Sequence, residues 1–289
     1  MAAKKVTKRR VHIPGKAYKD ISFLSSPDAR VVRILSEYLE PHSRFRHLRI
    51  RDTIVFFGSA RNTSMKEAKK ALALAQRNLK SALGRKVTPG KLGKFKRELK
   101  QAESGIEMAR YYEDAAKLSA MLTKWSASFG NKSGRRFIVC SGGGPGIMQA
   151  ANKGAIRAGG LSIGLNISLP HEQFPNPFIT PDLNFEFHYF FMRKFWFIYL
   201  AKALVVFPGG FGTLDELMEV LTLLQTNKIK KKMTVLIYGS EYWKKVLNFD
   251  LLVEKGAINR SDMKLFSFAD DPESAFKFLT RELKKNYDL

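Results

Sequence analysis

The chain has 289 residues, enough for one large domain with extensions, and its 50 Lys or Arg against 26 Asp or Glu give a formal net charge of +24. No run of about 20 apolar residues is present, and the basic N-terminus has no apolar segment behind it, so we expect neither a membrane span nor a signal peptide. The single cysteine, Cys140, excludes an internal disulfide and fits a reducing cytoplasm.

The first 50 residues are predicted to form a basic N-terminal extension that becomes helical near residues 28–39. From residue 51 onward, short apolar runs alternate with helical patterns, which favours an α/β fold with a doubly wound parallel sheet. Strands are expected near residues 53–58, 136–141, 161–167, 184–188, 203–207, 233–238 and 264–268.

Between the first two expected strands, at about residues 64–100, apolar residues recur at spacings of three and four. A Thr-Pro-Gly break at residues 88–90 divides this segment, so we predict an inserted antiparallel helical hairpin. Its second arm is expected to merge with the helix that follows the first strand. Twelve Lys or Arg and two Glu between Lys66 and Lys100 give the hairpin a net charge of about +10.

Two glycine-rich turns follow expected strands and precede expected helices, at residues 142–146 and 208–213. Such turns expose backbone N–H groups at the positive end of a helix, where a phosphate binds well. Asp215 and Glu216 follow the second glycine-rich turn, and we expect both in the first turn of the helix. A carboxylate at that position can bind a ligand, or it can do no more than complement the helix dipole. The loop at residues 58–62, after the first strand, is expected at the same edge of the sheet.

Neither turn matches the common nucleotide-binding fingerprints. The dinucleotide pattern requires a third glycine where Ile147 stands, and the Gly-Lys-Ser/Thr ending of a phosphate loop is absent. An NAD enzyme or a P-loop NTPase is therefore disfavoured.

Three segments resemble the LOG family of cytokinin riboside 5′-monophosphate phosphoribohydrolases, whose members are often mislabelled lysine decarboxylases. Ser141 to Met148 reads SGGGPGIM and is followed by AANKGA at residues 150–155. Met192-Arg193-Lys194 resembles the Arg-Lys pair of the family, and PGGFGTLDE at residues 208–216 matches its Pro-Gly-Gly-x-Gly-Thr-x-x-Glu signature at every fixed position. The resemblance spans about residues 51–270 and implies a Rossmann-like domain over residues 51–289, usually dimeric, that carries the hairpin as an insertion.

The resemblance implies hydrolysis of the N-glycosidic bond of a nucleoside 5′-monophosphate, such as AMP or a cytokinin riboside monophosphate, to free base and ribose 5-phosphate. It implies that Glu216 and Arg193 are catalytic. The substrate-binding residues that carry over are Glu172, Lys194, Gly209, Gly210, Gly212 and Thr213, and we expect Gly142 and Gly143 to line the same crevice. Around Glu172, the segment at residues 169–173 departs from the compact members in spacing.

The residue types fit this chemistry. A carboxylate near C1′, for which Glu216 is the candidate, can stabilise the positive charge on the sugar and orient or deprotonate the attacking water. Arg193 is planar and always charged, so it could polarise the leaving base or fix the sugar hydroxyls, and Lys194 could do either or bind phosphate. We expect no metal and no cofactor, since the sequence shows no His/Cys cluster.

The high positive charge has two explanations. Residues 4–10, the hairpin and residues 228–232 could form a nucleic-acid-binding face, or the charge could be a solvated surface that attracts anionic nucleotides. Apart from Phe95, no aromatic residue lies among the basic residues of the hairpin, so the solvated surface is favoured. The alternative function is a Rossmann-like nucleotide- or nucleic-acid-binding protein of the DprA-related type that does not hydrolyse its ligand. The preferred base and a role in cytokinin activation stay open.

Overall fold

The computed structural model of the protein describes residues 15–84, 87–130, 134–169 and 174–288. Its centre is a seven-stranded sheet with the order β4-β3-β2-β1-β5-β6-β7, and every neighbouring pair is parallel. The predicted α/β fold with a doubly wound parallel sheet is therefore confirmed. The strands are β1 Thr53–Phe57, β2 Ile138–Ser141, β3 Ser162–Ile167, β4 Asn184–Phe187, β5 Ala201–Val206, β6 Thr234–Tyr238 and β7 Phe266–Ala269.

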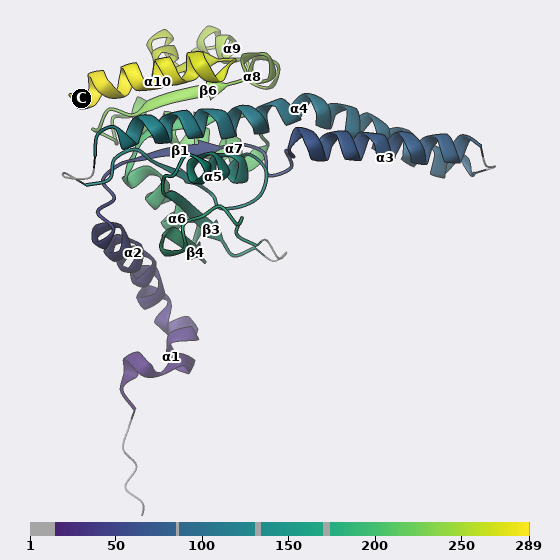
Figure 1. Ribbon diagram of the computed structural model, residues 1–289. Coiled ribbons are helices and arrows are strands. Elements are labelled where there is room, and N and C mark those ends of the chain that lie inside the picture. Colours follow the sequence, from purple (N-terminus) through teal and green to yellow (C-terminus); the bar gives the residue numbers. More distant parts are fainter. Residues whose placement is uncertain (1–14, 85–86, 131–133, 170–173, 289) are drawn as a thin grey trace, which may run out of the picture.

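Helices cover both faces of the sheet (Figure 1). On β1, Ile54 and Phe56 belong to one apolar core, with residues of α4, α5 and α10, whereas Val55 and Phe57 belong to the other, with residues of α2, α6 and α7. This alternation follows from the two-residue period of a strand. The helices are α1 Ile21–Ser25, α2 Arg30–His47, α3 Met65–Leu83, α4 Pro89–Ala127, α5 Ile147–Arg157, α6 Phe190–Tyr199, α7 Phe211–Gln225, α8 Ser240–Val246, α9 Phe249–Glu254 and α10 Pro272–Tyr287.

The strand order places a reversal at β1. The chain runs from β1 to β2, β3 and β4 on one side, and then returns to β5 on the other side of β1. At such a reversal, the loops after the two central strands diverge and leave a crevice at the carboxyl edge of the sheet. The loop after β1 and the second glycine turn, after β5, meet there: Ser59 N donates a hydrogen bond of 3.0 Å to Pro208 O.

A helical hairpin of α3 and the first half of α4 projects from the body (Figure 1). Ser64 begins α3 with a capping box that includes Glu67. The side of α3 that packs on α4 buries Ala68, Ala75 and Ala82, so the two helices approach closely. The 39-residue α4 then continues onto the sheet, where Leu118 and Leu122 are fully buried.

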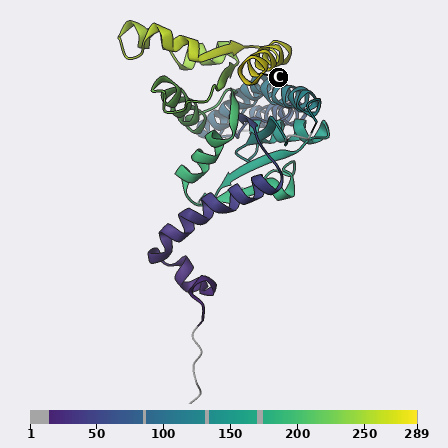
Figure 2. The ribbon, with the colours of Figure 1, turned by 90° about the vertical axis from the view of Figure 1, so that its left-hand side faces the viewer.

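The N-terminal extension is a helical arm that leads away from the sheet (Figures 1 and 2). Its long helix, α2, continues to His47, beyond the range expected from the sequence. Glu37 joins the arm to the body: its carboxylate accepts hydrogen bonds from the backbone N–H groups of His188 and Tyr189, and its carbonyl accepts one of 2.9 Å from Trp196 Nε1. Across the described ranges, no helix is long and apolar enough to span a membrane.

Candidate active site

A cleft of about 540 Å³ opens at the carboxyl edge of the sheet, between the loop after β1 and the glycine turn after β5. The end of β1 and the loop after it contribute Phe57 to Arg61, and the glycine turn with the start of α7 contributes most residues between Gly209 and Glu216. Arg193 of α6 lines the cleft as well. The other lining residues are Met108, Met148, Phe190 and Tyr242.

The turn at Gly209 is tightly packed, whereas Gly210 and Gly212 are open. A Cβ added to Gly209 would lie 2.1 Å from Thr213 Oγ1 and 3.0 Å from Ser59 N, and Gly209 O already accepts a 2.8 Å hydrogen bond from the Tyr242 hydroxyl. A Cβ added to Gly210 or Gly212 would meet nothing within 4 Å. The backbone there faces open space, which is what a bound phosphate at a helix start requires.

One expectation about this helix is wrong. The sequence predicted Asp215 and Glu216 in the first turn of the helix, but α7 already begins at Phe211, and its first turn contains no acidic residue. The two carboxylates lie in the second turn, because the helix continues back through Gly212 and Thr213 to its N-cap at Gly210. Complementing the helix dipole is therefore a weak explanation for Glu216, since that effect falls off within the first turn.

Glu216 is buried in the wall of the cleft and is 3% exposed. Its Oε2 has no hydrogen-bond partner within the part of the chain that the structure describes. Burial raises the pKa of this carboxyl to about 7, although the positive charges of Lys194 and Arg193 oppose the shift. An acid of this pKa, in a cleft and without a partner, can accept or hold a proton near neutral pH.

Arg193 is held by backbone carbonyls beside this carboxylate. Its Nε donates a 2.7 Å hydrogen bond to Leu165 O, and its Nη2 lies 3.5 Å from Gly142 O. The guanidinium carbon lies 4.8 Å from the centre of the Phe197 ring. Burial lowers the pKa of Arg193 from its ordinary value, an effect that the charge of Glu216 opposes. The side chain is thus oriented before any ligand binds.

Lys194 lies outside the lining of the cleft. Its Nζ is 2.7 Å from Asp215 Oδ2 and 2.8 Å from Glu219 Oε2, and it borders a neighbouring groove along α7. Burial lowers the pKa of Lys194, but these two hydrogen bonds outweigh that effect and raise the pKa above its usual range. The lysine is therefore a partly buried cation whose charge favours the ionised form of the Glu216 carboxyl.

Gly142 and Gly143 lie behind Arg193, outside the lining of the cleft. A Cβ on Gly142 would lie 2.5 Å from Arg193 Nη2, so this glycine leaves room for the guanidinium. Gly143 has φ +74°, and a Cβ there would lie 2.1 Å from Asn166 Oδ1. Both glycines therefore allow close packing around the first glycine-rich turn, at residues 142–146.

Asn176, which the sequence analysis missed, fixes the first glycine turn. Its Nδ2 donates to Gly143 O at 2.9 Å, to Gly144 O at 3.1 Å and to Asn152 Oδ1 at 2.9 Å. Its backbone N–H donates to Gly143 O as well. Its position between two prolines was the signal available in the sequence. Glu172 lies outside the described residues.

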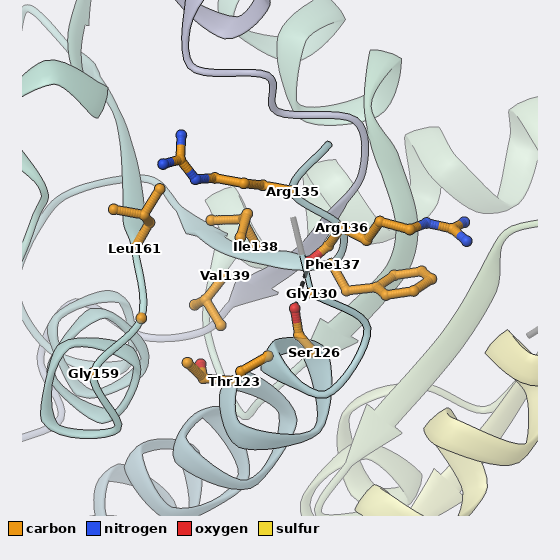
Figure 3. Close-up of a pocket in the computed structure, with 12 residues that line it drawn as sticks. Thr123, Ser126, Gly130, Arg135, Arg136, Phe137, Ile138, Val139, Gly159 and Leu161 are labelled. Carbon is orange, nitrogen blue, oxygen red and sulfur yellow. Dashed lines mark hydrogen bonds between the residues drawn. The ribbon is translucent and has the colours of Figure 1, made fainter. Parts of the chain in front are cut away.

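A smaller cavity of about 290 Å³ lies at the opposite edge of the sheet, where β2 and β3 begin (Figure 3). It is lined by the end of α4 and by residues 135–139, and Ser126 Oγ donates to Arg136 O at 2.5 Å. The Arg136 side chain forms a 2.6 Å ion pair with Asp52. No carboxylate lines this cavity, so the cleft beside Glu216 is the candidate active site. Throughout the described ranges, no three His, Cys, Asp or Glu side chains gather as a metal site.

Comparison with known proteins gives a family match that includes part of this cleft. The family model described as possible lysine decarboxylase matches residues 148–279, which include the α6 and α7 residues named above. The pyrimidine/purine nucleotide 5′-monophosphate nucleosidase of Escherichia coli K12 is 31% identical over 122 residues, which are 37% of this chain and 25% of that protein. The probable cytokinin riboside 5′-monophosphate phosphoribohydrolase LOG4 of Oryza sativa subsp. japonica is 33% identical over 81 residues, which are 28% of this chain and 35% of that protein.

The matched segments thus span about a quarter and a third of the length of these two relatives. Among solved structures, a Moco carrier protein from Chlamydomonas reinhardtii is 18% identical, with a TM-score of 0.41 over 81% of this chain and 99% of that protein. The family match and the two named relatives confirm the resemblance to the LOG family.

Proposed function

We propose that the protein hydrolyses the N-glycosidic bond of nucleoside 5′-monophosphates, AMP or a cytokinin riboside monophosphate among them, to the free base and ribose 5-phosphate. The names of the relatives indicate this type of activity for the family. The observation that carries the proposal for this chain is Glu216. It is a buried carboxyl with a pKa raised to about 7, its Oε2 has no hydrogen-bond partner among the described residues, and it lines a cleft together with Arg193.

The reaction follows from these groups. The bond between C1′ and the base nitrogen breaks, its electron pair leaves with the base, and positive charge develops on the sugar. Ionised Glu216 stabilises that charge and accepts a proton from the water whose oxygen bonds to C1′. The departing base takes up a proton from solvent to become the free base, and Glu216 returns its proton to solvent. Arg193, fixed by Leu165 O, donates hydrogen bonds to the leaving base or to the sugar hydroxyls.

The glycine turn is proposed to hold the 5′-phosphate. The open backbone at Gly210 and Gly212 lies at the N-terminal end of α7, where the partial positive charge of the helix favours an anion. The phosphate then places C1′ at a constant distance from the turn, so a nucleoside without phosphate loses this positioning.

A second copy of the chain is proposed to cover the exposed side of α6. Phe191 and Tyr199 are 55% and 46% exposed, and with Phe195 they border a groove of about 540 Å³ that reaches Leu223 of α7. Monomeric proteins rarely leave such an aromatic surface uncovered. A homodimer formed here would bring both copies of α7, and thus both clefts, close to the shared interface.

The decisive experiment measures the free base released from a panel of nucleoside monophosphates, with adenosine as the substrate that lacks phosphate. Base release from AMP but little from adenosine would support the proposal. If no nucleotide in the panel loses its base while nucleotides or nucleic acid still bind, the non-hydrolytic DprA-related alternative takes its place.

A further inference from the structure

The positive charge of α3 is gathered on one side of the helix. At 3.6 residues per turn, its exposed cations fall within an arc of about 100°. The buried alanines that contact α4 lie on the opposite side. We call the five exposed cations the α3 stripe: Lys66, Lys69, Lys70, Arg77 and Lys80.

Glu67 interacts electrostatically with Lys70, but no ion pair joins an acidic group to the stripe within the described residues. The carboxylate on α3, Glu67, is used in the capping box, where its Oε2 accepts a 2.7 Å hydrogen bond from the Ser64 hydroxyl. Like charges three or four residues apart destabilise a helix. The stripe contains such pairs, so repulsion between its charges lowers the stability of α3.

The position of the outer part of the stripe, Arg77 and Lys80, argues against a role in attracting the small substrate. The hairpin projects away from the sheet (Figure 1). At a rise of 1.5 Å per residue, Arg77 and Lys80 lie about 20 Å or more along the axis from the start of α3. The Debye length at physiological salt is about 8 Å, so solvent ions screen these two charges from the cleft.

We propose that the α3 stripe binds the sugar–phosphate backbone of a nucleic acid. A row of cations about 20 Å long fits several successive phosphates of one strand. The stripe contains no aromatic residue, so the contact is with phosphates and is independent of base sequence. This departs from the solvated surface that the sequence favoured, because the structure shows all five cations exposed while the opposite side of the helix is buried against α4.

An anionic membrane fits the same surface less well. A helix that lies on a bilayer buries an apolar face in the headgroup region. The side of α3 opposite the stripe is already buried against α4, through Ala68, Ala75 and Ala82. Beside the stripe, α3 exposes two large apolar side chains, Leu74 and Leu83.

The test uses the full-length protein and a variant that loses four charges of the stripe, K69Q/K70Q/R77Q/K80Q. The matched control, K264Q/K277Q/K284Q/K285Q, removes the same charge from exposed lysines near the C-terminus. Gln retains the helix propensity of Lys and Arg, and circular dichroism checks that α3 still forms. Fluorescence anisotropy with duplex DNA and with single-stranded RNA, each of about 20 nucleotides per strand, is measured over a series of salt concentrations.

We expect the stripe variant to bind at least about tenfold more weakly at moderate salt, with a shallower salt dependence, and the control to bind like the unmodified protein. If the stripe variant loses affinity for only one of the two probes, the contact is supported and that probe shows whether the ligand is DNA or RNA. Base release from AMP should be unchanged in both variants, which separates this contact from the proposed activity.

Three results would overturn the proposal. The unmodified protein could bind neither probe. The stripe variant could bind as tightly as the unmodified protein. The control could lose as much affinity as the stripe variant, which would make binding a matter of net charge. Binding to vesicles of anionic lipid, in place of both nucleic acids, would assign the stripe to a membrane instead.

Discussion

Lys194 Nζ lies 2.7 Å from Asp215 Oδ2, and this ion pair keeps the lysine against α7 while its neighbour Arg193 lines the cleft. Adjacent residues on a helix point about 100° apart, so the two cations of the Arg-Lys pair reach different surroundings. Arg193 is available to a ligand, whereas Lys194 acts on Glu216 through its charge. Of the two cations, Arg193 can therefore contact a ligand, whereas Lys194 adjusts the pKa of Glu216.

The first prediction concerns Lys194→Gln. The positive charge of Lys194 holds the pKa of Glu216 down, against the larger effect of burial. Removing it should raise that pKa further, so that a higher pH is needed to ionise the carboxyl. The acid limb of kcat/KM should move to higher pH, with a severalfold loss at about pH 6 and a small loss at high pH. Lys228→Gln, an exposed lysine that is not among the charges acting on Glu216, should leave the profile in place.

The second prediction concerns Glu216→Gln, which retains the shape of the side chain and removes its charge. Turnover of AMP should fall by about a hundredfold or more, whereas the affinity for the nucleotide survives, because the charge matters most in the transition state. The unmodified protein should gain activity as the pH rises through about 7, where Glu216 ionises. Steady-state kinetics between mildly acidic and mildly basic pH measure both effects, and normal turnover in the variant would remove Glu216 from the mechanism.

A third prediction uses the open space at Gly212. A Cβ there meets no protein atom within 4 Å, so Gly212→Val should change the free energy of unfolding by less than about 1 kcal/mol. The added side chain instead occupies the proposed phosphate position. KM for AMP should rise about tenfold or more, which corresponds to about 1.4 kcal/mol.

Gly209→Ala is the contrasting variant for the glycine turn. Its Cβ would lie 2.1 Å from Thr213 Oγ1, so the turn itself must shift and the unfolding free energy should fall too. An unchanged KM in Gly212→Val would contradict a role of this turn in binding phosphate.

The fourth prediction concerns Asn176→Ala. The substitution removes the side-chain donor to Gly144 O, whereas Gly143 O keeps the backbone N–H of residue 176 and Asn152 Oδ1 keeps the Ser141 hydroxyl. We expect a loss of about 1–3 kcal/mol in the free energy of unfolding, measured by denaturant titration. Asn78→Ala, on the half-buried side of α3, is the control and should have a small effect. Equal stability of both variants would show that the turn does not depend on Asn176.

The fifth prediction concerns the proposed dimer. Phe191 is 55% exposed on α6, so Phe191→Glu should leave the fold intact while placing a charge in the interface. The mass measured by light scattering should fall from that of a dimer to that of a monomer. Val246→Glu, at a 43% exposed position on α8, should stay dimeric. A monomeric unmodified protein would refute the dimer, and so would a dimer that survives Phe191→Glu.

Much of the architecture could be predicted because it depends on local patterns. Short apolar runs followed by helical periods predicted the seven strands to within a few residues, and the two glycine turns predicted the edge of the sheet at which the cleft lies. Helix boundaries that depend on tertiary packing differed from those expected from the sequence. The helix α7 begins at Phe211, because Gly212 and Thr213 adopt helical geometry, and this moved Asp215 and Glu216 into the second turn.

The sequence by itself determined the fold class and the chemical types available, since strand and helix periods and the glycine turns are properties of neighbouring residues. Only the tertiary structure decided which groups meet. It joined Lys194 to Asp215 and Glu219, left Glu216 Oε2 without a partner, and brought Asn176 to a turn 33 residues away. Burial and distance across the sheet set the pKa of Glu216 and the orientation of Arg193, because desolvation and electrostatic interactions depend on position in space. Gathering the basic residues of α3 into one stripe likewise required a folded helix with one side covered by α4.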